Sequence, residues 1–158
     1  MWMSRRLVRT VQVTACAATL LVGCSIALKA DLGGDADLQL QLATLLYDET
    51  RYQEALVAFT AATKAEDPQV ALSARKGTVR TALKVAEFIR ARQEADELLK
   101  TAGVDAEART LHADAMWSFG LFDEAEREYR ASVEATPGSA RARFGLARSL
   151  AATSKLEA

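Results

Sequence analysis

Two kinds of residue, large apolar ones and small ones, each recur about every 34 positions along this chain. Three aromatic residues and a leucine lie 36, 34 and 34 positions apart: Tyr52, Phe88, Phe122 and Leu156. A series of small residues has a similar spacing: Ala43, Gly77, Ala113 and Ala147. This period is typical of stacked helical hairpins, each of which buries its apolar face against a neighbour. We therefore predict an all-α fold, a right-handed α-solenoid of stacked antiparallel helix pairs over residues 36–158, rather than a compact enzyme core.

The composition supports close-packed helices. Half of the 158 residues are hydrophobic but only 6% are aromatic, so a core must consist mainly of Ala, Leu and Val. The net charge is −1, and residues 1–24 contribute three arginines and no acid. The remainder holds 17 basic and 21 acidic residues. A body with this charge gives no electrostatic basis for binding nucleic acid.

The N-terminus has the layout of a secretory signal. A short basic segment precedes an uncharged stretch of 19 residues, 10–28. As a helix at 1.5 Å per residue, this stretch would span about 28 Å, so an uncleaved membrane helix is the alternative. Either interpretation leaves the arginines in the cytoplasm and the body of the protein outside it.

Within this stretch the chain reads Leu21-Val22-Gly23-Cys24. These four residues resemble the bacterial lipoprotein signal, in which a leucine and small residues precede a cysteine. The resemblance implies that residues 1–23 are a cleaved signal peptide, that Cys24 carries the lipid, and that residues 24–35 include a short tether. The implied location is the cell envelope outside the cytoplasm, and Ser25 favours the periplasmic face of the outer membrane in a Gram-negative cell.

Each repeat is predicted to contain a helix A, a tight turn, a helix B and a second turn. The expected units are residues 36–69, 70–105, 106–139 and an incomplete 140–158. We expect Pro68 and Pro137 to mark the ends of two helices B, and Gly120 to end a helix A. The two series place two additional residues between Gly77 and Phe88, so the middle helix A should be longer or its turn should bulge.

The pattern within these units resembles the tetratricopeptide repeat. That family has a small residue in helix A, an aromatic and an alanine at the start of helix B, a second aromatic and a final proline. The first unit matches with Ala43, Tyr52, Ala55, Phe59 and Pro68, and the third with Ala113, Phe122, Ala125, Tyr129 and Pro137. The middle unit departs from the pattern, with Ala95 at the second aromatic position and Gly103 in place of proline.

The resemblance also implies where a partner would bind, since helix A of such repeats lines a concave groove that receives peptides or partner helices. The residues expected to face this groove are Leu40, Thr44, Tyr47, Asp114, Trp117, Phe144 and Arg148. Aromatic residues and arginine dominate binding energy at interfaces, which favours a binding role. The alternative is that Tyr47 and Trp117 only pack beside the next hairpin.

The residues give no basis for catalysis, for a metal or for a cofactor. His112 is the only histidine and lies in a helix A, where we expect it to pack in the core. One imidazole without a second histidine or a nearby cysteine makes neither a transition-metal site nor a catalytic triad. The carboxylates occur in mixed-charge helical runs, which are typical of solvated surfaces.

The sequence therefore predicts a non-enzymatic scaffold that holds a peptide or protein at the bacterial envelope. The alternative is that these repeats are the N-terminal targeting region of a longer envelope enzyme of hydrolase type, whose catalytic domain lies beyond residue 158. A third interpretation is self-association, since the last helix would expose Leu146, Leu150 and Leu156 with no following helix to cover them.

Overall fold

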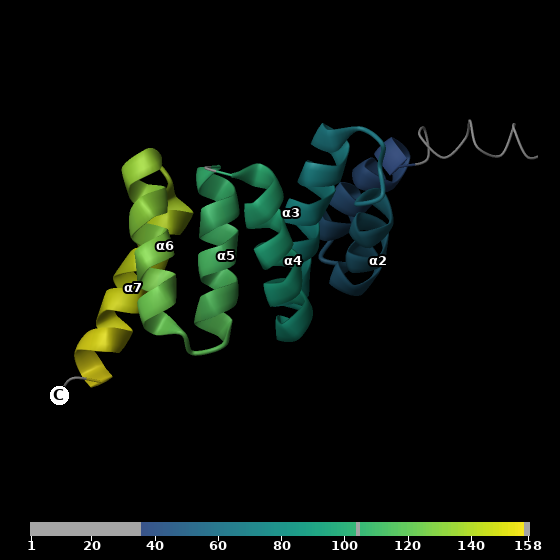
Figure 1. The fold of residues 1–158 in the computed structure, drawn as a ribbon. Helices are drawn as coiled ribbons and strands as arrows, with labels where there is room; N and C mark the ends of the chain where they lie inside the picture. Colours follow the sequence, from purple (N-terminus) through teal and green to yellow (C-terminus); the bar gives the residue numbers. More distant parts are fainter. Residues whose placement is uncertain (1–35, 104, 157–158) are drawn as a thin grey trace, which may run out of the picture. The chain divides into compact units, whose positions relative to one another are not determined.

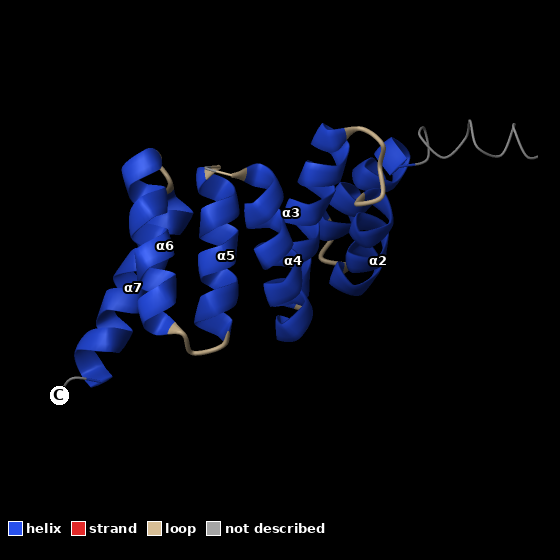
Figure 2. Ribbon diagram, in the orientation of Figure 1, coloured by secondary structure: helices blue, strands red, loops and turns tan. Residues whose placement is uncertain are grey.

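The computed structural model describes residues 36–103 and 105–156, and all regular secondary structure within these ranges is helical (Figure 2). The first helix in this part of the chain is described from residue 36 to residue 48. Six more follow in chain order: α2 (Tyr52–Ala62), α3 (Pro68–Lys84), α4 (Phe88–Ala102), α5 (Ala106–Ser118), α6 (Phe122–Ala135) and α7 (Ala140–Leu156). None of the helices in the described part is long and apolar enough to cross a membrane. The expected signal peptide and tether, including Cys24, lie outside the described residues.

The helices form antiparallel hairpins that follow one another along the stack (Figure 1). From α2 onward each helix packs against the next, and α5 also contacts both α3 and α7. The helix over 36–48 packs against α2 through a cluster that includes Ala43, Leu46 and Phe59. The predicted all-α stack is therefore confirmed: helix 36–48, α3, α5 and α7 are the helices A, and α2, α4 and α6 are the helices B.

The three turns between helix A and helix B share one backbone geometry. The middle residue of each turn has a positive φ: Thr50 at 62°, Ala86 at 62° and Gly120 at 75°. In each turn the next residue donates its N–H to a carbonyl five positions earlier, at 2.9, 2.9 and 3.1 Å. This left-handed closure favours glycine, because other L-residues lose roughly 1–2 kcal/mol there. Gly120 does end a helix A, as predicted.

Because the three turns have the same geometry, equivalent positions in the helices A are found by counting back from the first residue of each helix B. Nine residues before Tyr52, Phe88 and Phe122 stand three buried residues, Ala43, Val79 and Ala113. Gly77 therefore does not belong to the series of small residues in which we placed it. Of the two outcomes expected for this repeat, the bulged turn was wrong, because the turn before Phe88 has the same geometry as the other two.

The additional length lies before the middle hairpin. Helix α3 has 17 residues against 13 in α5, so a longer helix A is confirmed, but the extension is at its first turn. That turn begins at Pro68, with Asp67 accepting the Gln69 N–H as a cap at 2.8 Å. The prediction that Pro68 ends a helix was wrong: α2 stops at Ala62, and proline is tolerated at the first helical position because its missing N–H has no partner there. Pro137 does lie just beyond α6.

Where one hairpin packs on the next, a residue of helix B faces a residue of the following helix A, and one of the two is large while the other is small. A Cβ added to Gly77 would lie 2.3 Å from the Phe59 ring, and one added to Gly145 would lie 2.3 Å from the Tyr129 ring. The equivalent residues in the middle are Ala95 and Leu111, both fully buried in one cluster. The missing aromatic at Ala95 is thus balanced by a larger residue on the following helix A.

The last helix covers the third hairpin only in part. Leu146 packs against the cluster that contains Tyr129, so the prediction that it is exposed was wrong. Leu150 is 41% exposed and Phe144 is 69% exposed. The side chain of Leu156 lies outside the described residues. Ala147 is exposed, since the helix that would pack on it in a full repeat is not among the described helices.

Candidate functional site

The seven candidate groove residues line two adjacent hollows formed by the helices A. The first hollow, of about 310 Å³, is lined by Leu40, Thr44, Tyr47, Asp48, Phe59, Ser73, Gly77 and Arg80. The second, of about 470 Å³, is lined by Tyr47, Arg80, Leu83, Lys84, Phe88, Asp114, Trp117, Ser118, Arg141, Phe144 and Arg148. Tyr47 and Arg80 belong to both, so the two hollows adjoin along the helices A.

Sequence reasoning missed three cations of this site, Arg80, Lys84 and Arg141. The first two were missed because no groove residue was predicted in the middle repeat, where the register had been set on Gly77. Counting nine residues back from Phe88 gives Val79, which makes Arg80 the counterpart of Thr44 and Asp114 in the neighbouring helices A. This count was available from the sequence. Arg141 was missed because it lies in the first turn of α7, a part of helix A for which we made no prediction.

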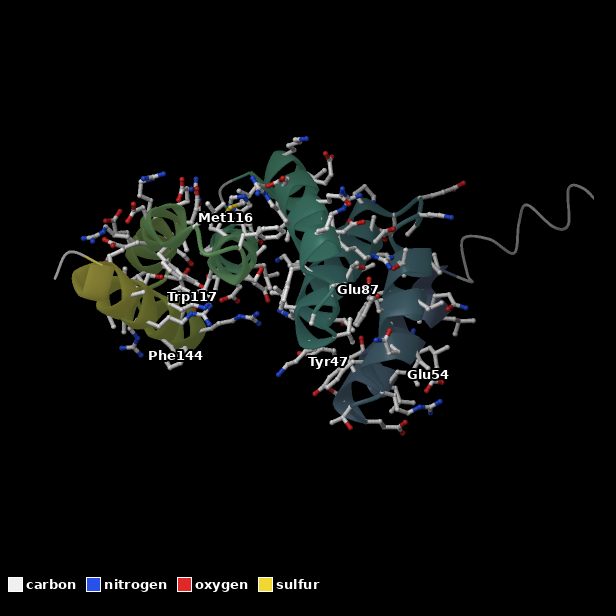
Figure 3. The ribbon with its side chains drawn as sticks, turned by 90° about the horizontal axis from the view of Figure 1, so that it is seen from below. Tyr47, Glu54, Glu87, Met116, Trp117 and Phe144 are labelled. Carbon is white, nitrogen blue, oxygen red and sulfur yellow. The ribbon has the colours of Figure 1, made fainter. Side chains whose placement is uncertain are left out.

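Two aromatic candidates have a packing role and also line a hollow. The ring centroids of Tyr47 and Tyr52 lie 5.2 Å apart in an edge-on arrangement, and those of Trp117 and Phe122 lie 4.6 Å apart. Each contact joins helix A to helix B within one hairpin. Phe144 differs, because most of its surface is open to solvent. Figure 3 labels Tyr47 on one side and Trp117 and Phe144 on the other, with nitrogen-bearing side chains between them.

Asp114 lines the second hollow, but most of its side chain is buried. Its side chain is 11% exposed and accepts a hydrogen bond from the Tyr129 hydroxyl. Arg141 donates Nε and Nη2 to Asp114 Oδ2 at 2.7 and 2.6 Å, and Arg148 donates Nη2 to Oδ1 at 2.7 Å. The guanidinium of Arg148 also lies 4.6 Å above the Trp117 ring. Asp114 therefore holds two arginines of α7 in place at the edge of the hollow.

Tyr129 remains a neutral donor in this network. Burial raises its pKa above the ordinary value, and the negative charge of Asp114 raises it further. A hydroxyl that keeps its proton can donate to Asp114 while it accepts from Arg148 Nη2 at 2.5 Å. Its ring meanwhile fills the space above Gly145.

The second hollow carries an excess of positive charge. Four cationic side chains and one carboxylate line it, so the lining has a net charge of +3. Arg80 forms an ion pair with Glu107, and Lys84 Nζ lies 5.9 Å from the Tyr52 ring centroid. Burial lowers the pKa of Arg80 below its ordinary value, and the nearby charge of Arg141 lowers it further. Such a surface can hold anionic groups beside apolar ones.

His112 fits the packed position expected for it. Its side chain is 14% exposed, and Nε2 lies 3.1 Å from Asp96 Oδ1 on α4. Nδ1 is buried without a hydrogen-bond partner. Within the described residues, no three His, Cys, Asp or Glu side chains are grouped so that they could hold a metal ion.

Several solved structures share this fold. The first tetratricopeptide repeat domain of human RPAP3 has a TM-score of 0.70 at 16% identity, covering 79% of this chain and 97% of that one. The first such domain of Spaghetti (RPAP3), bound to an HSP90 peptide, has a TM-score of 0.68 at 15% identity, covering 77% and 95%. The second domain of human RPAP3, in complex with an HSP70 peptide, has a TM-score of 0.62 at 15% identity, covering 76% and 96%.

Sequence comparison gives the family directly. No curated protein matches this chain. A family model described as tetratricopeptide repeat matches residues 76–139 and residues 110–158. The two matches overlap in the third repeat and together span more than half of the chain. They include α5 and α6, the hairpin in which the family pattern is complete. On this match and on the stacked hairpins described above, the chain belongs to the tetratricopeptide repeat family.

Proposed function

We propose that this protein is a non-catalytic scaffold that binds an extended segment of a partner protein along its helices A. The observation that carries the proposal is the lining of the second hollow, where Tyr47, Trp117 and Phe144 from three helices A meet in one place. Aromatic side chains and arginines contribute most binding energy at protein interfaces. Two solved structures with this fold contain bound HSP90 and HSP70 peptides, which agrees with a peptide as the kind of ligand.

An extended segment suits this surface because the two hollows adjoin at Tyr47 and Arg80. A peptide crossing both would contact side chains from all four helices A. The first hollow would contribute Leu40 and Thr44. The Thr44 hydroxyl donates a hydrogen bond to the Leu40 carbonyl at 2.9 Å. The second would contribute the aromatic and cationic groups.

We further propose that the scaffold is held at the bacterial cell envelope by a lipid on Cys24, outside the cytoplasm. Support comes from the arginines, the uncharged stretch and the Leu21-Val22-Gly23-Cys24 motif. A lipid anchor and an attached repeat domain would keep the captured partner near the membrane surface.

Site-specific photocrosslinking in intact cells tests the binding surface. A photoreactive amino acid at position 144 should capture a discrete partner, because Phe144 is 69% exposed and lines the second hollow. The matched control is position 57, since Val57 is 72% exposed but lies on α2 away from both hollows.

Trp117→Ala should weaken the adduct at position 144 by about tenfold, which is the effect of losing one strong interface contact. Circular dichroism and thermal unfolding of the variant serve as controls, because Trp117 also packs on Phe122. Equal capture from positions 57 and 144 would contradict the proposed surface. A loss of thermal stability that matches the loss of the adduct would make Trp117 a packing residue only.

A further inference from the structure

One face of the helix over 36–48 displays three leucines to solvent. Leu38, Leu42 and Leu45 are 63%, 45% and 57% exposed, and we call them the leucine stripe. The contact of this helix with α2 uses other residues, among them Ala43 and Leu46. Several large apolar side chains exposed side by side on one helix are typical of an interaction surface.

The spacing of the leucine stripe is that of a seam between two helices. Intervals of four and then three residues place Leu38, Leu42 and Leu45 at successive d, a and d positions of a heptad. The side chains beside them, Gln39 and Gln41, are uncharged. In such a seam the leucines of one helix fit between those of the other. The face is therefore matched by a helix that carries the same pattern.

A second copy of this chain supplies that pattern. A contact that uses the same stripe on both copies is isologous, so it closes after two copies and gives a dimer rather than a fibre. Two acids next to the stripe have a partner within their own copy: Asp37 accepts from Gln41 Nε2 at 2.8 Å, and Glu49 pairs with Arg51 at 3.4 Å. A third, Asp48, lines the first hollow. Charge therefore does not oppose the meeting of two stripes.

The membrane surface is a poorer match for this face. Helices that lie in the plane of the bilayer are rich in Lys and Arg, which attract anionic headgroups. Residues 36–50 contain three acids and neither Lys nor Arg. An anionic leaflet would repel this helix, whereas an uncharged leucine seam is indifferent to that field.

Contact through the leucine stripe leaves the proposed binding surface open. On the same helix, Leu40, Thr44 and Tyr47 line the hollows, and the stripe residues are absent from the lining of both. Helical spacing places the two sets on different faces. The helix over 36–48 is also at the opposite end of the stack from α7 (Figure 1). Two joined copies could each keep a partner bound.

We infer that this protein forms a twofold dimer through the leucine stripe, and that the dimer forms when copies are confined to one membrane. A stable interface buries about 800 Å² on each partner, and three leucines over two helical turns provide less. The contact is therefore weak between copies that diffuse freely. Confinement raises the effective concentration without any new contact.

The confinement rests on the lipid anchor of the proposed function. Residues 25–35 separate Cys24 from the helix over 36–48, so the stripe would lie within about 40 Å of the lipid. Anchored copies would present their stripes in one layer and in one orientation relative to the membrane. A dimer would then offer two grooves side by side, and a partner with two binding segments would be held more tightly than by either groove alone.

Disulfide crosslinking of the full chain in intact cells tests the dimer. No cysteine follows Cys24, so Leu42→Cys adds one thiol at the centre of the stripe, near the twofold axis. Mild oxidation should give a covalent dimer, whereas the wild type reports any dimer formed through its own cysteines. The matched control is Ile89→Cys, which is on α4 at a position that is 70% exposed. It should give about tenfold less dimer, since a disulfide needs Cα atoms less than about 7 Å apart.

Removal of the neighbouring leucines tests the seam itself. In the Leu42→Cys protein, adding Leu38→Gln and Leu45→Gln should lower the yield of covalent dimer about tenfold, because two apolar side chains no longer leave water. Adding Ile89→Gln instead should leave the yield unchanged. Both leucines are exposed, so the thermal unfolding of the variant should match that of the Leu42→Cys protein.

The outcomes separate the dimer from the proposed function, which is measured by partner capture from position 144. Capture at position 144 with no more crosslinking from position 42 than from position 89 would overturn the dimer and leave the scaffold intact. A dimer without capture at position 144 would support the dimer and contradict the scaffold.

Three results would assign the leucine stripe to something other than a second copy, and each would overturn the inference. The first is a covalent dimer that survives Leu38→Gln with Leu45→Gln, because the contact would then lie elsewhere. The second is a monomer whose Leu42→Cys thiol the bilayer protects from a membrane-impermeant maleimide. The third is a crosslink from position 42 to a different protein.

Discussion

Single glycines determine how closely consecutive hairpins can pack. Gly77 and Gly145 are buried under the rings of Phe59 and Tyr129, which leave no room for a methyl group. In a helix interior, glycine is about 1 kcal/mol less favourable than alanine. The close approach of each aromatic ring to the next helix A offsets this cost through additional buried contact.

Gly145→Ala should lower the free energy of unfolding by about 1–3 kcal/mol, although alanine is the better helix former. The added Cβ would overlap the Tyr129 ring, which also bonds to Asp114 and cannot move without breaking that contact. Urea unfolding followed by circular dichroism measures the change. Gly138→Ala is the control, since its Cβ would meet nothing within 4 Å. A Gly145→Ala variant at least as stable as the wild type would show that the ring adapts freely.

At the scale of residues, the positions of the side chains that face the hollows could be predicted from the sequence, but their roles could not. Tyr47, Trp117 and Phe144 could be placed because helical spacing fixes the face on which a residue lies. Asp114 does line the second hollow, as expected, but its carboxylate is mostly buried, because two arginines from α7 bond to it and the spacing does not reveal this. Arg80 was missed because no groove residue was predicted in the middle repeat, whose register had been set on Gly77, a residue that lies against the Phe59 ring.

Two of the helices begin at an aspartate that caps the first turn. Asp67 and Asp105 cap α3 and α5 through hydrogen bonds to backbone N–H groups, both at 2.8 Å. Asp105 also receives Lys76 Nζ at 2.9 Å, which links α3 to the start of α5. Burial alone would raise the pKa of Asp105, but the bonds from Lys76 and Ala108 and the charge of Lys76 lower it below the ordinary value.

Asp105→Asn should therefore lower stability at neutral pH and have no effect in acid. Asparagine caps a helix about as well as aspartate, so the substitution removes the charge and leaves the cap. A carboxyl whose folded pKa is depressed stabilises above its unfolded pKa of about 3.9, and this contribution is lost as the pH falls through the folded pKa. We expect a difference of about 0.5–1 kcal/mol near pH 7 that shrinks as the pH falls through the depressed pKa of the folded state.

Urea unfolding of both proteins across this pH range measures the effect. Asp67→Asn is the matched control, because Asp67 also caps a helix but has no lysine partner among the described residues. Asp67→Asn should show the smaller difference at neutral pH. A difference for Asp105→Asn that persists unchanged into acid would contradict the role of the ion pair with Lys76.

At the scale of elements, helix ends were predictable where the chain needs a special backbone. Gly120 marks a left-handed turn because glycine adopts a positive φ freely. Ala86 adopts the same conformation without that signal, so the end of α3 could not be recognised from its residue type. Pro68 was misplaced because proline both follows one helix and begins another, and only the cap at Asp67 distinguishes these positions.

The whole molecule follows from repetition of one hairpin. Each hairpin contacts mainly its neighbours, so the fold class could be predicted from a period alone. The middle repeat preserves the stack with Ala95 against Leu111 in place of an aromatic against glycine. The meeting of Arg80 and Lys84 with the arginines of α7 in the second hollow could not be predicted in this way, because it depends on how α3 and α7 both pack on α5.

Cys24→Ser should release the protein from the membrane fraction and abolish its labelling by a palmitate analogue in growing cells. The proposal attributes anchoring to a lipid on the thiol of Cys24, and serine offers no thiol. Cys16→Ser is the matched control, since Cys16 belongs to the segment that cleavage would remove. A Cys24→Ser protein that stays in the membrane fraction would support an uncleaved membrane helix instead.

The contacts of Asp114 bear on how tightly a ligand can bind. Arginine side chains are flexible, and immobilising one on binding costs about 0.5–1.5 kcal/mol of conformational entropy. Arg141 and Arg148 are fixed by Asp114 before any ligand arrives, and Trp117 stacks on one of them. The binding surface is therefore pre-organised on its α7 side. An incoming segment would mainly have to order Lys84 and itself, so even a short ligand could bind with useful affinity.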